Sequence, residues 1–265
     1  MHITDQIGTR LAFDRTPQRI VSLVPSQTEL LVDLGLEDHI VGVTKFCIHP
    51  LHLRGEKDVV GGTKQVDFAK ITALQPDIIL CNKEENTKEI VERLQAITSV
   101  HTSDIITVQE SLELILQYGV IFKKEKEAQQ LATAITKERT DFLKELKKST
   151  QNSVGYFIWK EPMMVAGGDT FINTLLEEAG FTNAFTSVEG RYPEVQAKQL
   201  IDLDYIFLSS EPFPFKEEHI ALFKKNTTAR VVLVDGEYFS WDGSRLLNAY
   251  AYFRDLRSKL ELQEL

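Results

Sequence analysis

The sequence predicts an α/β fold with two Rossmann-like lobes joined by one long inter-lobe helix. Three observations support this prediction: short apolar runs alternate with helical patterns, one helical stretch is much longer than the rest, and the two halves of the chain resemble each other. The expected domain boundaries are an N-terminal lobe over residues 1–123, a connecting helix over 124–149 and a C-terminal lobe over 150–265.

Six short apolar runs are the expected strands. Most of them are continuous in hydrophobic residues, as is typical of strands buried on both faces of a parallel sheet. The runs cover residues 19–24, 39–43, 77–81, 153–159, 204–209 and 230–234. Helical patterns lie between them, and this alternation indicates the α/β class.

The helices between these strands have recognisable ends. Ser26 and Glu29 fit a capping box, in which the serine oxygen accepts a backbone N–H and the glutamate reaches back to the cap residue. Gly35 then supplies the left-handed position that ends this helix. A corresponding helix in the second half is expected to open at Asp169 and to close at Gly180.

One segment breaks the alternation of strands and helices. Residues 124–149 contain no Gly or Pro, and Leu131, Ile135, Phe142 and Leu146 form one apolar stripe at helical spacing. An ordinary surface helix would have the same pattern, but the position near the middle of the chain favours a rigid connector. The two halves also match in order, since residues 28–35 resemble residues 173–180 at a constant offset.

Composition and charge exclude several classes of protein. The chain has 265 residues, 43% of them hydrophobic, and a formal net charge of −9. This acidic balance argues against nucleic acid as a partner, because phosphate binding needs a concentrated cationic surface. No apolar run approaches the roughly 18 residues of a membrane span. The motifs of serine hydrolases, zinc proteases, P-loop proteins and dinucleotide-binding enzymes are also missing, which predicts a protein that is not an enzyme.

The first residues and the cysteines bear on the cellular compartment. After Met1 there is neither a cationic start nor an apolar stretch of signal-peptide type, so the sequence predicts a cytoplasmic protein. A periplasmic protein whose signal peptide had been removed would look the same, and this alternative stays open. Cys47 and Cys81 are expected to be two reduced thiols, because two cysteines cannot build a disulfide framework.

The residues that follow each predicted strand are the candidate ligand-binding residues, because open α/β sheets bind ligands at the carboxyl ends of their strands. Aromatic rings among them offer stacking surfaces, cations can meet anionic groups, and amide or carboxylate groups can form hydrogen bonds. The candidates are Ser26, Lys45, Phe46, Lys64, Asn82, Glu85, Trp159, Arg191, Tyr192, Glu211, Phe239 and Trp241.

Cys47 and His49 form the stretch that is most typical of a metal site. Thiolate and imidazole ligands suit zinc, copper or iron. The same spacing also arises by chance, with Cys47 as a small buried hydrophobe and His49 as a hydrogen-bonding loop residue. The metal interpretation gives an alternative function, a cytosolic metal-dependent enzyme or a metal or cofactor carrier that uses Cys47, His49 and nearby carboxylates.

Residues 19–29, with the sequence RIVSLVPSQTE, resemble the opening of the class III substrate-binding proteins, the helical-backbone receptors for cobalamin, ferric siderophores and haem. Residues 41–43, residues 71–77 and the long central helix fall where that family has them, and the likeness is greatest to the cobalamin-binding branch. The resemblance implies two α/β lobes, a lobe-spanning helix and the binding of a metal-containing small molecule without chemistry.

The sequence also departs from this family. Its members dock on the permease of an ABC transporter through a glutamate on each lobe, and Ala69 and Lys198 occupy the matching positions, which argues against such a partner. The cobalamin branch lines its cleft with tryptophans. The matching positions here hold Thr63 or Lys64, Asn82, Met164 and Tyr192, which argues against a corrin ligand.

Overall fold

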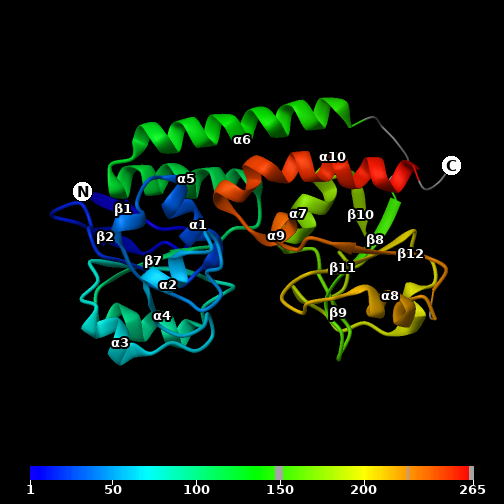
Figure 1. The fold of residues 1–265 in the computed structure, drawn as a ribbon, viewed down its shortest axis with the longest axis horizontal. Helices are drawn as coiled ribbons and strands as arrows, with labels where there is room; N and C mark the ends of the chain where they lie inside the picture. The colour runs from blue at the N-terminus through cyan, green and yellow to red at the C-terminus, as the bar shows by residue number, and fades with distance from the viewer. Residues whose placement is uncertain (147–151, 226, 263–265) are drawn as a thin grey trace. The chain divides into compact units, whose positions relative to one another are not determined.

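The computed structural model describes residues 1–146, 152–225 and 227–262 of the chain (Figure 1). The chain divides into two compact units. Unit 1 comprises Met1–Ile105, Gln109–Thr136 and Asp242–Leu247, and unit 2 comprises Ile106–Val108, Lys137–Trp241 and Asn248–Leu265. Neither unit is a single continuous stretch of sequence, and the division between them falls inside the long helix.

Unit 1 is built on a five-stranded sheet in which every neighbouring pair of strands is parallel. In spatial order the strands are β5 (Asp58–Val59), β4 (Ile40–Val43), β3 (Ile20–Ser22), β6 (Ile78–Asn82) and β7 (Ser99–Ser103). A separate antiparallel ribbon pairs β1 (His2–Thr4) with β2 (Arg10–Ala12).

The helices of unit 1 follow its strands in alternation. They are α1 (Pro25–Asp33), the short 3-10 helix η1 (Glu37–His39), α2 (Leu53–Glu56), α3 (Phe68–Ala73), α4 (Lys88–Gln95), α5 (Val108–Phe122) and the 3-10 helix η3 (Gly243–Arg245). Side-chain caps begin two of them: Asp67 accepts the N–H of Lys70, and Thr87 accepts the N–H of Ile90. Their apolar faces cover a core that includes Val21.

The predicted capping box at the start of α1 is wrong. The helix begins at Pro25 after Val24, and no side chain caps it. Ser26 and Glu29 instead bond to residues near the end of the chain, as described below. The predicted stop is confirmed, because Gly35 adopts a φ of 72°, in the left-handed region that glycine enters without strain.

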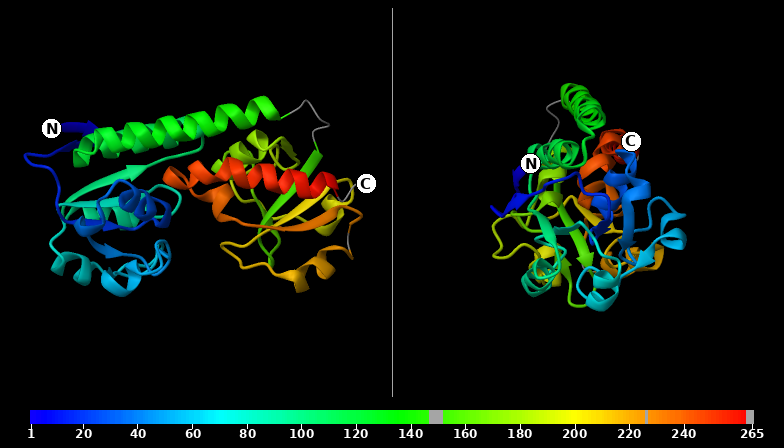
Figure 2. Two further views of the ribbon diagram at one scale, coloured as in Figure 1. Left: turned by 45° about the horizontal axis from the view of Figure 1, so that its top comes forward. Right: turned by 90° about the vertical axis from the view of Figure 1, so that its left-hand side faces the viewer.

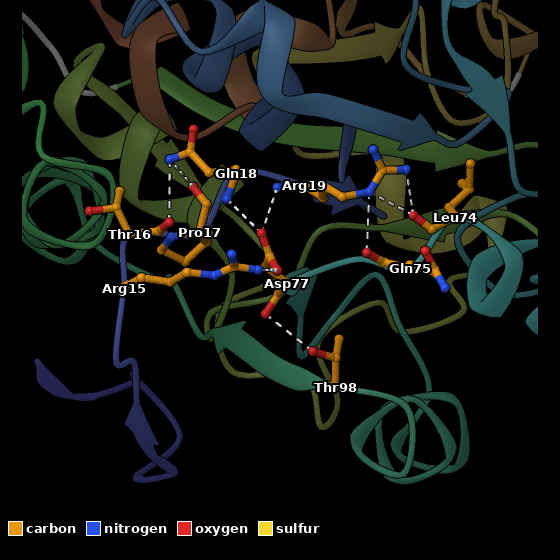
Figure 3. Close-up of polar contacts among 9 residues, drawn as sticks. All are labelled: Arg15, Thr16, Pro17, Gln18, Arg19, Leu74, Gln75, Asp77 and Thr98. Carbon is orange, nitrogen blue, oxygen red and sulfur yellow. Dashed lines mark hydrogen bonds and ion pairs between the residues drawn. The ribbon is translucent and has the colours of Figure 1, made fainter.

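Asp77 ties the loop before β3 to the first residues of β6 (Figure 3). Its carboxylate accepts the backbone N–H groups of Gln18 at 2.8 Å and Arg19 at 3.1 Å, and the guanidinium of Arg15 at 3.2 Å. Burial alone would raise the pKa of Asp77, but these hydrogen bonds outweigh it and hold the pKa below its ordinary value. The guanidinium of Arg19 donates to the carbonyl of Leu74 at 2.6 Å.

Unit 2 contains a second parallel sheet. Its strands, in spatial order, are β10 (Phe181–Asn183), β8 (Asn152–Trp159), β11 (Tyr205–Ser209) and β12 (Arg230–Val234), and β9 (Met164–Val165) pairs antiparallel with β8. Its helices are α7 (Phe171–Glu178), η2 (Ala197–Leu200), α8 (Glu217–Phe223), α9 (Glu237–Ser240) and α10 (Leu246–Leu262). The prediction of an α/β fold with two parallel-sheet lobes is therefore confirmed.

The long central segment is one unbroken helix, α6 (Glu125–Glu145), as Figure 2 shows. Its residues up to Thr136 belong to unit 1 and those from Lys137 onward to unit 2. In unit 2 the ring of Phe142 lies 5.8 Å from that of Tyr250 on α10. The last residues of the predicted connector, 147–149, lie outside the described part of the chain. Among the described residues, none of the helices combines the length and apolar composition that crossing a membrane requires.

Candidate functional site

In unit 1, six of the candidate residues lie at or beyond the carboxyl ends of its parallel strands: Asn82 is the last residue of β6, and the other five follow a strand. These candidates are Ser26, Lys45, Phe46, Lys64, Asn82 and Glu85. Because the strands run parallel, these segments share one edge of the sheet.

Asn82 shapes the turn after β6. Its side-chain oxygen accepts the N–H of Glu84 at 2.8 Å and the N–H of Glu85 at 3.2 Å, and its amide nitrogen donates to the hydroxyl of Ser103 at 2.9 Å. The side chain of Asn86 closes the same turn by accepting the N–H of Asn82 at 2.9 Å. Asn82 is buried, and its hydrogen bonds fix the turn that carries the half-buried Glu84 and Glu85.

Lys64 lies against this turn. Its ammonium donates to the carbonyl oxygen of Glu84, and Asn86 donates to the carbonyl of Thr63 at 2.9 Å. The segment after β5 and the turn after β6 are thus joined, with the ammonium of Lys64 against the backbone of Glu84. The result is a mixed cationic and acidic surface at this edge of the sheet.

Phe46 is an aromatic ring exposed to solvent in the same region of unit 1. The residue is 49% exposed, which is high for a phenylalanine in a folded domain. The ammonium of Lys45 lies 5.0 Å from the centre of its ring, within the range of a cation–π contact. A side chain at Gly62 would come within 3.2 Å of the ring, so this glycine leaves room for Phe46.

Ser26 makes a contact that the sequence did not indicate. Its hydroxyl donates to the carboxylate of Asp242 at 2.7 Å, and both side chains are buried. Burial raises the pKa of Asp242 to about 6, and the negative charges of Glu85 and Glu84 add to this rise, whereas the hydrogen bond from Ser26 opposes it. The available signal for Asp242 is its place in the sequence, directly after the candidate Trp241 and close to Phe239.

A second contact joins α1 to the same distant segment. The guanidinium of Arg245 forms two hydrogen bonds with the carboxylate of Glu29, at 2.7 and 3.0 Å. Burial raises the pKa of Glu29, and the charge of Arg245 opposes this rise. A paired, partly buried carboxylate of this kind holds the backbone segments together.

Cys47 is a fully buried thiol. Its sulfur lies 3.1 Å from the hydroxyl of Thr28 and 3.3 Å from that of Thr44. Burial raises the pKa of Cys47, which favours the protonated thiol over the thiolate that binds metals. Among the described residues, the group of possible metal ligands whose ligand atoms lie within 4.8 Å of one another does not include Cys47 or His49. Metal binding at those two residues stays a prediction.

In unit 2, Trp159 is the open aromatic side chain among the candidates. It is the last residue of β8, is 40% exposed, and donates its indole N–H to the carbonyl of Glu161 at 3.0 Å. The ring of Phe213, in the loop after β11, meets it edge-on at 5.5 Å between centres. These two rings form an apolar surface beyond the strands of unit 2.

Glu211 and Trp241 bond to each other. One carboxylate oxygen of Glu211 accepts the indole N–H of Trp241 at 2.9 Å and the hydroxyl of Ser240 at 2.5 Å. Trp241 is buried, so its polar atom is satisfied inside unit 2. These contacts fix the loop after β11 against the end of α9.

Phe239 has no exposed surface. Its ring lies 5.3 Å from that of Tyr156 and 4.9 Å from that of Phe253, so it is part of an aromatic core. The sequence predicted a ring that stacks on a ligand, because Phe239 lies beyond the end of a predicted strand. The short helix α9 turns it inward instead, and the structure leaves it no face for a ligand.

The loop with Arg191 and Tyr192 is held against the segment after β9. The N–H of Gly167 donates to the carbonyl of Arg191 at 2.8 Å. A Cβ atom at Gly167 would lie 2.5 Å from the carbonyl oxygen of Gly190, so this close approach requires glycine. Arg191 and Tyr192 are both partly buried in this position.

This fold, with aromatic and charged side chains beyond the strand ends of each unit, defines a two-lobed α/β binding protein. A family model described as "Periplasmic binding protein" matches residues 20–229. The chain belongs to this family. Membership confirms the prediction of a substrate-binding protein that is not an enzyme, and it favours this interpretation over the metal-dependent enzyme that the sequence also allowed.

Known proteins resemble the chain over most of its length. It is 28% identical over 196 residues to the uncharacterized ABC transporter substrate-binding lipoprotein YvrC of Bacillus subtilis, covering 71% of this chain but only 62% of that protein. It is 26% identical over 190 residues to the vitamin B12-binding protein of Vibrio campbellii, covering 69% and 67%. The crystal structure of the periplasmic vitamin B12 binding protein BtuF of Vibrio cholerae shares the fold, with a TM-score of 0.78 at 20% identity over 91% and 98% of the two chains.

The prediction of a cytoplasmic location is wrong. The family is one of periplasmic binding proteins, and the relatives include a lipoprotein of an ABC transporter and a periplasmic protein. The prediction depended on the first few residues alone, whereas the family match extends over residues 20–229.

Proposed function

We propose that the chain is the substrate-binding component of an ABC transporter and that it binds a metal-containing small molecule of the cobalamin, siderophore or haem class. The observation that carries the proposal is the exposed ring of Phe46, with the cation Lys45 beside it and the exposed Lys64 at the same edge of the unit 1 sheet. The names of two relatives, both vitamin B12-binding proteins, support a large metal-containing ligand.

The charges favour an anionic member of this class. Lys45 and Lys64 are exposed, and each can form a charge-assisted hydrogen bond with a carboxylate or phosphate. In unit 1, Phe46 offers a flat surface on which a macrocycle or an aromatic chelating group can stack. Trp159 is a separate stacking surface of unit 2. Haem and many ferric siderophores carry both features, whereas cobalamin has mostly neutral amide side chains.

Spectroscopic and calorimetric titration with hemin, an anionic ferric siderophore and cyanocobalamin tests this proposal. We expect saturable one-to-one binding of at least one of the three. If hemin or the siderophore binds, the double variant Lys45→Ala/Lys64→Ala is expected to bind at least tenfold more weakly, because two charge-assisted hydrogen bonds are lost. Phe46→Ala is expected to weaken binding of the same ligand through loss of stacking.

The matched control is Lys259→Ala, which removes an exposed lysine from α10. Its affinity is expected to equal that of the wild type. Failure of all three ligands to bind would contradict the proposed class of ligand. Unchanged affinity of the double variant for an anionic ligand would contradict the proposed role of the two lysines.

For the partner, we propose a membrane permease of the ABC type, which the name of the Bacillus relative supports. Ala69 lies in α3 and Lys198 in η2, so docking there would not use a carboxylate at either position. A photo-crosslinking side chain at position 69 or 198 tests the proposal in cells. Crosslinks to an integral membrane protein are expected, and crosslinks to soluble proteins alone would contradict it.

A further inference from the structure

Three side chains with metal-binding atoms converge in unit 1, and none of them is among the candidate ligand residues. Glu37, His52 and Glu56 each offer one ligand atom, and these atoms all lie within 4.8 Å of one another. Glu37 begins η1, directly before β4, and Glu56 ends α2, shortly before β5. The cluster therefore lies toward the amino ends of two parallel strands, whereas Lys45 and Lys64 follow the carboxyl ends.

The backbone places these three side chains together for two reasons. His52 is the N-cap of α2 and Glu56 is its last residue, so the two are four positions apart, the spacing at which helical side chains share a face. Glu37 arrives from a separate segment, and its carboxylate lies 2.7 Å from Nε2 of His52. All three side chains are at least partly exposed, so an ion has a path from solvent.

We propose that Glu37, His52 and Glu56 bind a divalent transition-metal ion, with Zn²⁺ as the preferred member. One imidazole and two carboxylates are a donor set that suits zinc, with water completing the coordination. Ligand atoms at about 2.0–2.2 Å from a tetrahedral zinc are roughly 3.3–3.6 Å apart. The Glu37–His52 contact must therefore lengthen by about 0.6–0.9 Å from its 2.7 Å, a movement that exposed side chains make readily.

Charge supports the binding of a cation at this place. The two negative charges of Glu37 and Glu56 exceed the single positive charge of Lys57, which acts electrostatically on His52. A bound ion would join η1 to α2 and so fix the two ends of the intervening segment. That segment contains Lys45 and Phe46, so the ion would stiffen residues that the proposed ligand contacts.

Calorimetry with Zn²⁺ and visible absorption with Co²⁺, on the full chain without any organic ligand, test this site. We expect one equivalent of either ion to bind the wild type saturably. His52→Ala is expected to bind at least tenfold more weakly, and Glu37→Gln and Glu56→Gln at least threefold more weakly. The absorption of bound Co²⁺ reports its coordination number directly.

Two control variants make the result specific. His2→Ala removes an exposed histidine outside the cluster and is expected to bind as the wild type does. Cys47→Ala is also expected to retain the ion. Circular dichroism of each variant verifies that it is folded.

The proposal is overturned if the wild type takes up no stoichiometric ion, or if His52→Ala titrates like the wild type. Loss of the ion in Cys47→Ala with retention in His52→Ala would overturn it too, and would assign the ion to Cys47 and His49. None of these results depends on the organic ligand, so the metal site and the proposed function succeed or fail separately.

Discussion

The hydroxyl of Ser26 donates a hydrogen bond of 2.7 Å to the carboxylate of Asp242, which lies 216 positions later in the chain. The Glu29–Arg245 ion pair, also 2.7 Å long, spans the same interval. Together they bond α1 to Asp242–Leu247, the late segment that belongs to unit 1. The first helix of unit 1 is thus completed by residues that follow nearly all of unit 2 in sequence.

Asp242→Asn is expected to change how stability depends on pH. The pKa of Asp242 is raised from 3.8 to about 6 in the folded state, so the folded protein prefers the protonated carboxyl. The stability contributed by this group is fully present below pH 3.8 and is lost as the pH rises through about 6. The side-chain amide of the variant would keep an acceptor for Ser26 without the buried charge.

Urea unfolding at pH 5 and pH 8 measures this effect. Between these two pH values we expect Asp242→Asn to gain on the order of 1–2 kcal/mol relative to the wild type, since each pKa unit corresponds to about 1.4 kcal/mol. Equal pH dependence in the two proteins would show that Asp242 is not protonated preferentially on folding.

Asp77→Asn is expected to have the opposite dependence on pH. The lowered pKa of Asp77 means that its contribution is present above the ordinary value of 3.8 and is lost as the pH falls through the folded pKa. At pH 7 the variant is expected to be about 1–3 kcal/mol less stable, because hydrogen bonds to a charged acceptor are weakened. Chemical denaturation measures the loss. Asp14→Asn, at an exposed position, is the control and is expected to change little.

Arg245→Met is expected to destabilise unit 1 by about 2–4 kcal/mol, because it leaves the partly buried carboxylate of Glu29 without its ion-pair partner. Glu29→Gln in the same background is expected to restore part of this loss. A double-mutant cycle on the free energy of unfolding measures the coupling. Additive effects of the two substitutions would contradict a direct interaction.

Gly167→Ala is expected to lower stability by about 1–3 kcal/mol, since the new Cβ would lie 2.5 Å from a backbone oxygen that cannot move aside. The melting temperature measures the effect. Gly55→Ala is the matched control, because a Cβ at that position meets nothing within 4 Å. If both variants melted at the same temperature, the close approach at Gly167 would not constrain the loop.

Much of the fold could be predicted because strands buried in a parallel sheet appear in the sequence as short runs of hydrophobic residues. The six short apolar runs correspond to β3, β4, β6, β8, β11 and β12. The strand β7 was missed because its sequence is mostly polar: His101, Thr102 and Ser103 are all buried in it. Hydrogen-bond partners elsewhere in unit 1 stabilise several of these groups, and such partners are not visible in local sequence.

The candidate site was less predictable, because its side chains also have partners that are distant in sequence. The spacing of Ser26 and Glu29 fits a helix cap, but partners more than two hundred residues away compete for both side chains. Phe239 follows a strand, as a ligand-facing ring would, yet α9 packs it into the core. Periodicity predicts which segments are helices or strands, whereas the direction of a loop side chain depends on tertiary contacts.

The return of Asp242–Leu247 to unit 1 also constrains how the protein can be made. A gene fragment that stops before residue 242 encodes an α1 helix whose Ser26 and Glu29 have lost their bonding partners. During synthesis on the ribosome, α1 emerges early, but its hydrogen bonds to Asp242 and Arg245 can form only after almost the whole chain has been made.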